Sequence, residues 1–130
     1  MDMLISFIAV GHIIFGPRNS AVVAGDAMSM ECRTNEEFRV RGWILKRAHG
    51  EPVPVYLHGD PIPYLPEFTH FGAQVNASGS GMIYTNSTRM DDAGLYTCVT
   101  RQSPDDKAVK ATAHLTVFGT NNETYVQLGY

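Results

Sequence analysis

Apolar and polar residues alternate along several short segments of the chain, as they do in half-buried β-strands. These segments are separated by turns that contain glycine, proline or asparagine, such as 17–20, 25–26 and 49–52, and such residues interrupt regular strand pairing. The pattern therefore predicts an all-β domain built of short strands. The expected strands cover 21–24, 28–32, 38–47, 53–57, 73–75, 82–85, 94–100 and 109–118.

Both cysteines lie in these alternating segments. Cys32 shares one face of its expected strand with the apolar Met30, and Cys98 shares a face with Tyr96, so both cysteines are expected to point inward. Trp43, the only tryptophan, follows eleven residues after the first cysteine and is placed to pack on the sulfurs. Two inward cysteines on separate strands describe a disulfide between two sheets. The alternative is a pair of unpaired thiols in the core.

Six residues agree in order and spacing with a known signature: Cys32, Trp43, Asp92, Gly94, Tyr96 and Cys98. Together they resemble the signature of the immunoglobulin superfamily, in which a tyrosine two residues before the second cysteine forms a tyrosine corner. The resemblance covers roughly residues 17–118. It implies a two-sheet antiparallel sandwich with one inter-sheet disulfide, in which all six residues have structural roles.

Two features favour the variable type of this fold. The cysteines are 66 positions apart, and a domain without the extra strands of a variable domain needs fewer residues between them. In addition, the expected strand 53–57 contains Pro54, which confines it to the edge of a sheet. An extra edge strand at this point of the chain is typical of a variable-type domain.

The segment 82–88 departs from the pattern of the family. Counting back from the second cysteine, the usual apolar core positions fall on Ile83, Thr85 and Thr88, and two of these residues are polar. Either a one-residue shift turns Met82 and Tyr84 inward, or this corner of the core is thinner.

The ionic partner of Asp92 is a second departure. Variable domains commonly place an arginine at the start of the strand that here precedes Val75, where it pairs with this carboxylate. No arginine occupies that position in this chain, and Arg89 is only a loose substitute. The sequence therefore does not predict a salt bridge to Asp92.

Outside the core domain, the two ends of the chain have different compositions. Residues 1–16 contain an apolar run that is shorter than the about 18 residues needed to span a membrane. Two interpretations stay open for them: a signal peptide, although Asp2 stands where positive charge is expected, or a first edge strand near Val10 to Phe15. Residues 119–130 form a polar tail or linker, and no membrane segment is predicted in this chain.

Length and charge bound the class of protein. The chain has 130 residues, 44% of them hydrophobic, and a net charge of −3, which fits one globular domain without a generally basic surface for nucleic acid. Sequons for N-glycosylation begin at Asn76, Asn86 and Asn122. Beside an expected disulfide, these three triplets favour an extracellular glycoprotein, either secreted or the ectodomain of a cell-surface protein.

The sequence gives little support for catalysis, a metal site or a cofactor. Its five histidines do not recur at the spacings of zinc ligands, and no Cys-x2-Cys, nucleophile elbow or glycine-rich phosphate loop is present. His58 and Asp60 lie close in sequence, but a proline-rich exposed loop commonly carries such residues as solvated ones. We therefore expect a binding protein, not an enzyme.

The expected binding surface is the outward face of the sheet that contains Trp43 and Cys98. Its candidate residues combine aliphatic side chains with a rim of cations: Val40, Ile44, Lys46, Thr97, Val99, Arg101 and His114. Such a mixture favours a protein partner of the receptor, adhesion or immune-recognition kind, with a second copy of the chain among the candidates. Alternatively, neighbouring side chains or a glycan shield this face, and a secreted defence molecule binds a carbohydrate or pathogen ligand through loops 58–71 and 102–106.

Overall fold

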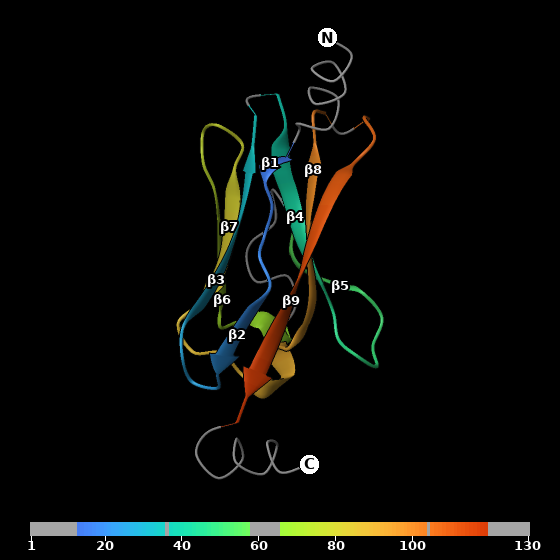
Figure 1. The fold of residues 1–130 in the computed structure, drawn as a ribbon. Coiled ribbons are helices and arrows are strands. Elements are labelled where there is room, and N and C mark those ends of the chain that lie inside the picture. The colour runs from blue at the N-terminus through green and yellow to red at the C-terminus, as the bar shows by residue number, and fades with distance from the viewer. Residues whose placement is uncertain (1–12, 36, 58–65, 104, 120–130) are drawn as a thin grey trace.

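Two β-sheets pack face to face and form the fold (Figure 1). The computed structural model describes residues 13–35, 37–57, 66–103 and 105–119. The four-stranded sheet has the order β1 (Ile13–Phe15), β3 (Met28–Thr34), β7 (Gly81–Thr85) and β6 (Phe71–Val75). The five-stranded sheet has the order β2 (Ser20–Val23), β9 (Val109–Phe118), β8 (Gly94–Arg101), β4 (Arg39–Lys46) and β5 (Val53–Leu57). This architecture confirms the predicted all-β sandwich.

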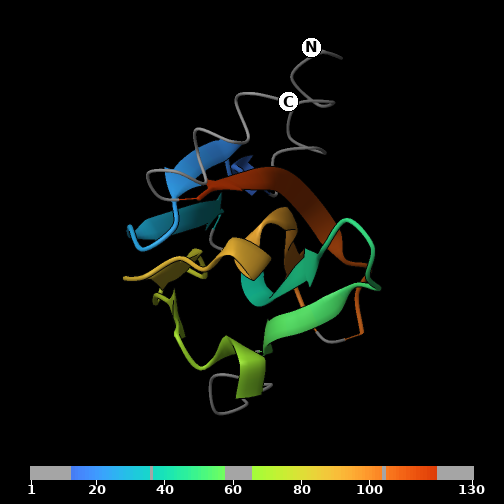
Figure 2. The ribbon, with the colours of Figure 1, turned by 90° about the horizontal axis from the view of Figure 1, so that it is seen from below.

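Neighbouring strands run antiparallel, except that β2 runs parallel to β9. β5, which contains Pro54, lies at the edge of its sheet, as a strand with an internal proline requires. Two short 3-10 helices, η1 (Pro66–Phe68) and η2 (Met90–Asp92), connect the strands. η2 lies at the lower end of the sandwich in Figure 1 and between the two layers in the end-on view of Figure 2. None of the helices described here is long and apolar enough to cross a membrane.

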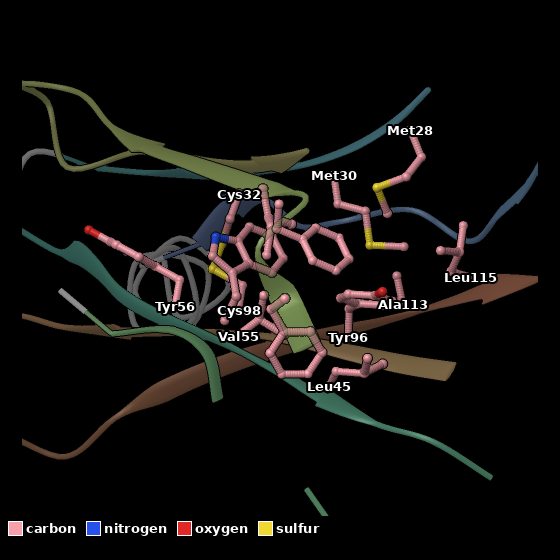
Figure 3. Packing of buried hydrophobic residues seen from close by; sticks show 14 of the residues in the cluster. Met28, Met30, Cys32, Leu45, Val55, Tyr56, Tyr96, Cys98, Ala113 and Leu115 are labelled. Carbon is pink, nitrogen blue, oxygen red and sulfur yellow. A yellow bond between two sulfur atoms is a disulfide. The ribbon is translucent and has the colours of Figure 1, made fainter. Parts of the chain in front are cut away.

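The disulfide lies at the centre of the core. Cys32 on β3 and Cys98 on β8 are bonded across the two sheets, with their Cα atoms 6.5 Å apart, which confirms the predicted pairing. Both cysteines and Trp43 are fully buried. Figure 3 shows the sulfurs surrounded by apolar side chains from both layers. The alternation of apolar positions therefore placed the inward faces of both cysteine strands correctly.

A β-bulge in β4 changes which residues of that strand face the core. The pairing of β4 with β8 shifts register between Val40 and Gly42, so that Arg41 is the extra residue. Beyond this bulge the alternation is reversed, and Val40 is fully buried against Gly81 of the opposite sheet. The expectation that Val40 belongs to the outward face is therefore wrong, because strict alternation counted back from Trp43 takes no account of an extra residue.

The corner of the core near β7 is polar but well satisfied. Ile83, Thr85 and Thr88 are buried, whereas Met82 and Tyr84 are only half-buried, so no one-residue shift has occurred. The Thr88 hydroxyl donates to the Asp26 carbonyl at 2.6 Å, and the Thr85 hydroxyl donates to the Ser87 carbonyl. Hydrogen bonds of this kind offset the cost of burying a hydroxyl. The first of the two sequence alternatives, a one-residue shift, is therefore wrong.

The partner of the Asp92 carboxylate is His70, which immediately precedes β6. Nε2 of His70 lies 2.9 and 2.8 Å from the two carboxylate oxygens, and the Arg89 backbone N–H donates to the same carboxylate at 2.7 Å. The Asp92 side chain is 1% exposed and that of His70 is 10% exposed. A histidine thus occupies the place at which the family pattern has an arginine, while Arg89 contributes its backbone.

Tyr96 closes the same corner from β8. Its hydroxyl donates to the Asp92 carbonyl at 2.6 Å, and the side chain is fully buried. Burial, followed by the nearby Asp92 charge, raises the pKa of Tyr96 far above its usual range. The hydroxyl therefore keeps its proton and remains a donor at neutral pH.

We expect Tyr96→Phe to lower the free energy of unfolding by about 1–3 kcal/mol, because it leaves the buried Asp92 carbonyl without its donor. Chemical denaturation would measure the change. Tyr84→Phe is the matched control, since Tyr84 is only half-buried, and it is expected to change stability little. Equal effects of the two substitutions would contradict a special role for the Tyr96 hydroxyl.

Gly94, at the start of β8, cannot be replaced without distortion. Its φ angle is +153°, and a β-carbon there would lie 2.6 Å from the Lys46 carbonyl oxygen and 2.9 Å from Cδ1 of Leu45. The glycine therefore allows β8 to pass close to the end of β4. This close approach fixes where the two strands meet beside the corner formed by Asp92 and Tyr96.

The described part of the sandwich begins at Ile13. β1 pairs with β3, with Ile13 opposite Thr34 and Phe15 opposite Arg33, as an edge strand near Val10 to Phe15 requires. Residues 1–12 lie outside the described residues, and cleavage of the chain after Gly16 would remove β1. A cleaved leader at residues 1–16 therefore stays a prediction, as do the domain boundaries at 17 and 118.

Candidate binding face

The outer face is the surface of the five-stranded sheet that points away from the four-stranded sheet. Residues directly opposite one another in paired strands lie on the same face of a sheet, so the strand pairing defines three rows across β5, β4, β8 and β9. The first row is Lys46, Leu95 and His114; the second is Pro54, Ile44, Thr97 and Thr112; the third is Leu57, Gly42, Val99 and Lys110.

The centre of the outer face is apolar. Ile44, Leu57 and Val99 come from three neighbouring strands and are all half-buried. Between them lies Gly42, and Cδ2 of Leu57 comes within 3.3 Å of the position that a β-carbon on Gly42 would take. The Leu57 side chain therefore leans over the glycine. The result is a continuous apolar patch across β5, β4 and β8.

The charged side chains on the strands that carry this patch are all basic. The strands of the five-stranded sheet contain no aspartate or glutamate, although the whole chain has a net charge of −3. Lys46 and Lys110 are exposed, while Arg39 instead directs its guanidinium to the Asn76 carbonyl of the other sheet. Carboxylates near the ends of these strands belong to connecting segments, at Asp26, Glu37, Glu51, Asp91, Asp92, Asp105 and Asp106.

Six of the seven residues expected on this face lie on strands β4, β8 and β9 as outward or half-buried side chains. Ile44, Thr97 and Val99 are half-buried, and Lys46 and His114 are exposed. Arg101 at the end of β8 is half-buried and takes part in a contact of its own. Val40 is the exception, for the reason given above. Their role in binding stays a prediction.

Six members of the three rows were not among the expected residues: Gly42, Pro54, Leu57, Leu95, Lys110 and Thr112. The alternation along β8 and β9 already places Leu95 and Lys110 outward, so a signal for these two was present. Leu57 was less accessible to sequence reasoning, because a register shift also occurs in the pairing of β4 with β5. Only the pairing itself shows which residues of β5 lie opposite Gly42 and Ile44.

A hollow of about 390 Å³ opens at the end of the outer face formed by the first row. Its lining residues come from the end of β4, the start of β8 and the middle of β9: Lys46, Arg47, Ala48, Ala93, Gly94, Leu95 and His114. The lining is mostly apolar, with basic side chains at the rim. Such a site can accept an apolar group together with negative charge.

Both described sequons lie in segments that follow strands of the four-stranded sheet. Asn76 follows β6 and Asn86 follows β7, and both are exposed. The carboxamide oxygen of Asn76 accepts hydrogen bonds from the backbone N–H and the hydroxyl of Ser78. A glycan at either site would start on a connecting segment and not on a strand of the outer face. Asn122 lies outside the described residues.

Histidine side chains are possible metal ligands. Among residues 13–35, 37–57, 66–103 and 105–119, no group of three or more His, Cys, Asp or Glu side chains is arranged to hold a metal ion. His58 and Asp60 lie outside the described residues, together with most of the expected binding loop 58–71.

Comparisons with known proteins agree with this fold. No family model matches the chain. Over 108 residues, 80% of this chain, the sequence is 29% identical to the peroxidasin homolog of Mus musculus, of which the match spans only 6%. A chicken TCR structure superposes with a TM-score of 0.69 at 16% identity, covering 83% of this chain and 50% of that chain.

A structure of Dpr11 IG1 bound to DIP-gamma gives a TM-score of 0.63 at 19% identity and covers 82% of this chain and 50% of that chain. Together with the inter-sheet disulfide and the Tyr96 corner, these likenesses show that the chain has an immunoglobulin-like fold. The five-stranded sheet, with its extra edge strand β5, is consistent with the variable type.

Proposed function

We propose that this domain is a non-catalytic recognition module that binds a protein partner through its outer face. The observation that carries the proposal is the apolar patch of Ile44, Leu57 and Val99, bordered by cations on strands that bear no carboxylate. A patch of this kind, with an apolar centre and a polar rim, has the anatomy of a protein interface. The Dpr11 IG1 structure offers a structurally similar domain in a complex with another protein.

The same proposal places the domain outside the cell. A disulfide buried in the core is stable in an oxidising compartment, and the exposed Asn76 and Asn86 are accessible to glycosylation enzymes. Glycans at these two positions would start away from the strands of the outer face, because both positions follow strands of the other sheet. This arrangement favours an open outer face over one shielded by sugar.

The test uses the folded domain, multimerised as a probe, against an array of secreted and cell-surface ectodomains. For any ectodomain that binds, Ile44→Glu and Val99→Glu are expected to weaken binding at least about tenfold, since each buries a charge at the centre of the patch. Gln74→Glu, an exposed position on β6 of the other sheet, is the matched control and should bind as the wild type does. Thermal unfolding of each variant would show that the fold is intact.

Binding that survives both substitutions on the outer face would contradict the proposal. It would assign the site to the loops, where a carbohydrate or pathogen ligand is the alternative. A glycan array probed with the same multimer would then provide the direct measurement.

A further inference from the structure

The hollow at the first row of the outer face has a chemical character that the rest of the face lacks. We propose that it receives an apolar side chain that a different protein presents between carboxylates. This inference rests on the proposed function and names the chemistry of the partner at one end of the same face.

The floor of the hollow explains why an apolar side chain is expected to bind there. It is formed by Ala93, Gly94 and Leu95 as the chain enters β8, with Ala48 beyond the end of β4. Gly94 contributes no side chain, and Ala48 and Ala93 contribute only a methyl group each, so the lining residues leave the space open for an apolar group from outside.

The rim of the hollow explains why carboxylates are expected beside that apolar side chain. Lys46 and His114 are exposed on either side of Leu95 in the first row. Nζ of Lys46 contacts only the Arg47 carbonyl, at 3.4 Å, among the described residues, and no described carboxylate pairs with it. A carboxylate from a partner would supply the missing counter-charge at the edge of a low-polarity hollow, where it interacts more strongly than in open water.

Arg47 does not share this role, although it lines the hollow. Its guanidinium forms an ion pair with Glu67 at 3.3 Å, donates to the Asp91 carbonyl and lies over the Phe68 ring. These contacts already satisfy its charge on the side of η1 and η2. The positive charge available to a partner at the hollow therefore comes from Lys46.

The charge distribution argues against a second copy of this chain as the occupant. The strands of the outer face carry no carboxylate, so two copies joined through this face would bring lysines toward lysines. Val23 and Met90 are the large hydrophobic residues that are well exposed in the described part of the chain. Met90 stands between Arg89 and Asp91, so a carboxylate flanks it on one side only, and Val23 has no acidic neighbour in sequence. Neither residue therefore presents an apolar side chain between two carboxylates.

The first experiment follows backbone amide shifts of the isotope-labelled domain by NMR during titration with three synthetic peptides. Each peptide contains one leucine, which is flanked by glutamates in the first peptide, by glutamines in the second and by lysines in the third. When all three peptides are added at the same concentration, we expect only the glutamate peptide to shift the amide signals of Leu95 and His114. Equal shifts with the glutamine peptide, shifts centred elsewhere, or the same shifts from acetate alone would each overturn the proposal.

Matched charge reversals locate the effect. Lys46→Glu and Lys110→Glu change the net charge equally, and Lys110 lies two rows from the first row, about 13 Å along β9 from His114. Lys46→Glu is expected to weaken the glutamate peptide at least about tenfold, whereas Lys110→Glu should retain most of the binding. Equal losses in the two variants would mean that only overall charge matters, and would overturn the proposal.

Failure of this inference is distinguishable from failure of the proposed function. With an ectodomain partner, loss of binding in Ile44→Glu but not in Lys46→Glu would refute the occupied hollow and leave the outer face as the binding site. Unchanged binding in both variants would refute both proposals. Sedimentation velocity of the wild type supplies the remaining control: a dimer that Lys46→Glu dissociates would make the occupant a second copy and overturn the choice of partner.

Discussion

Replacement of Cys98 by alanine is expected to lower the free energy of unfolding by more than about 2 kcal/mol. The disulfide closes a loop with a sequence separation of 66 between two sheets. For a loop of that length, the restriction of the unfolded chain corresponds to about 4 kcal/mol in the chain-entropy account. Since a small domain has a net stability of only about 5–15 kcal/mol, the bond supplies a large share of it.

Urea denaturation of the oxidised wild type and of Cys98→Ala would measure this difference. Cys32→Ala is the matched variant, because both cysteines are fully buried and either substitution removes the same bond. The two variants should therefore lose similar stability. Detection of two free thiols in the wild type by mass spectrometry would show that the disulfide is absent and would contradict the prediction.

Removal of the Asp92 carboxylate is expected to have a comparable effect, about 3–5 kcal/mol in Asp92→Ala. The carboxylate accepts from the Arg89 backbone N–H and lies against Nε2 of His70, and its side chain is 1% exposed. Its loss leaves both groups buried without their acceptor, which costs more than the pair itself contributes. The neighbouring substitution Asp91→Ala, at an exposed position, is the control and should alter stability by less than about 0.5 kcal/mol.

Sequence patterns predicted the sandwich because its determinants are local. Period-two alternation identified the inward faces around Cys32 and Cys98, and the spacing to Trp43 and Tyr96 completed the core. The position of Val40 was predicted incorrectly, because a β-bulge changes the phase of a strand without a marker in its composition. Alternation therefore predicts which face of the sheet a residue lies on only up to the next β-bulge in the strand.

Contacts between segments distant in sequence were less predictable. His70 and Asp92 are 22 residues apart, and their pairing depends on where η2 and the start of β6 meet in space. The candidate face shows the same limit: Leu57 becomes part of it only through its alignment with Gly42 across the β4–β5 pair. The hollow near Lys46 arises from three strand segments at once, which no single stretch of sequence encodes.

The parallel pairing of β2 with β9 has a mechanical consequence. Ser20 lies opposite Leu115 and Val23 lies opposite Phe118, so the chain enters this pair at one end and leaves it at the other. Tension applied to the chain before Ser20 and after Phe118 would therefore act along both strands and strain all of their hydrogen bonds together, instead of opening them one after another. Resistance to pulling would then depend on the few residue pairs between β2 and β9. These pairs lie just after the point where the chain passes from the sheet of β1 to the sheet of β2.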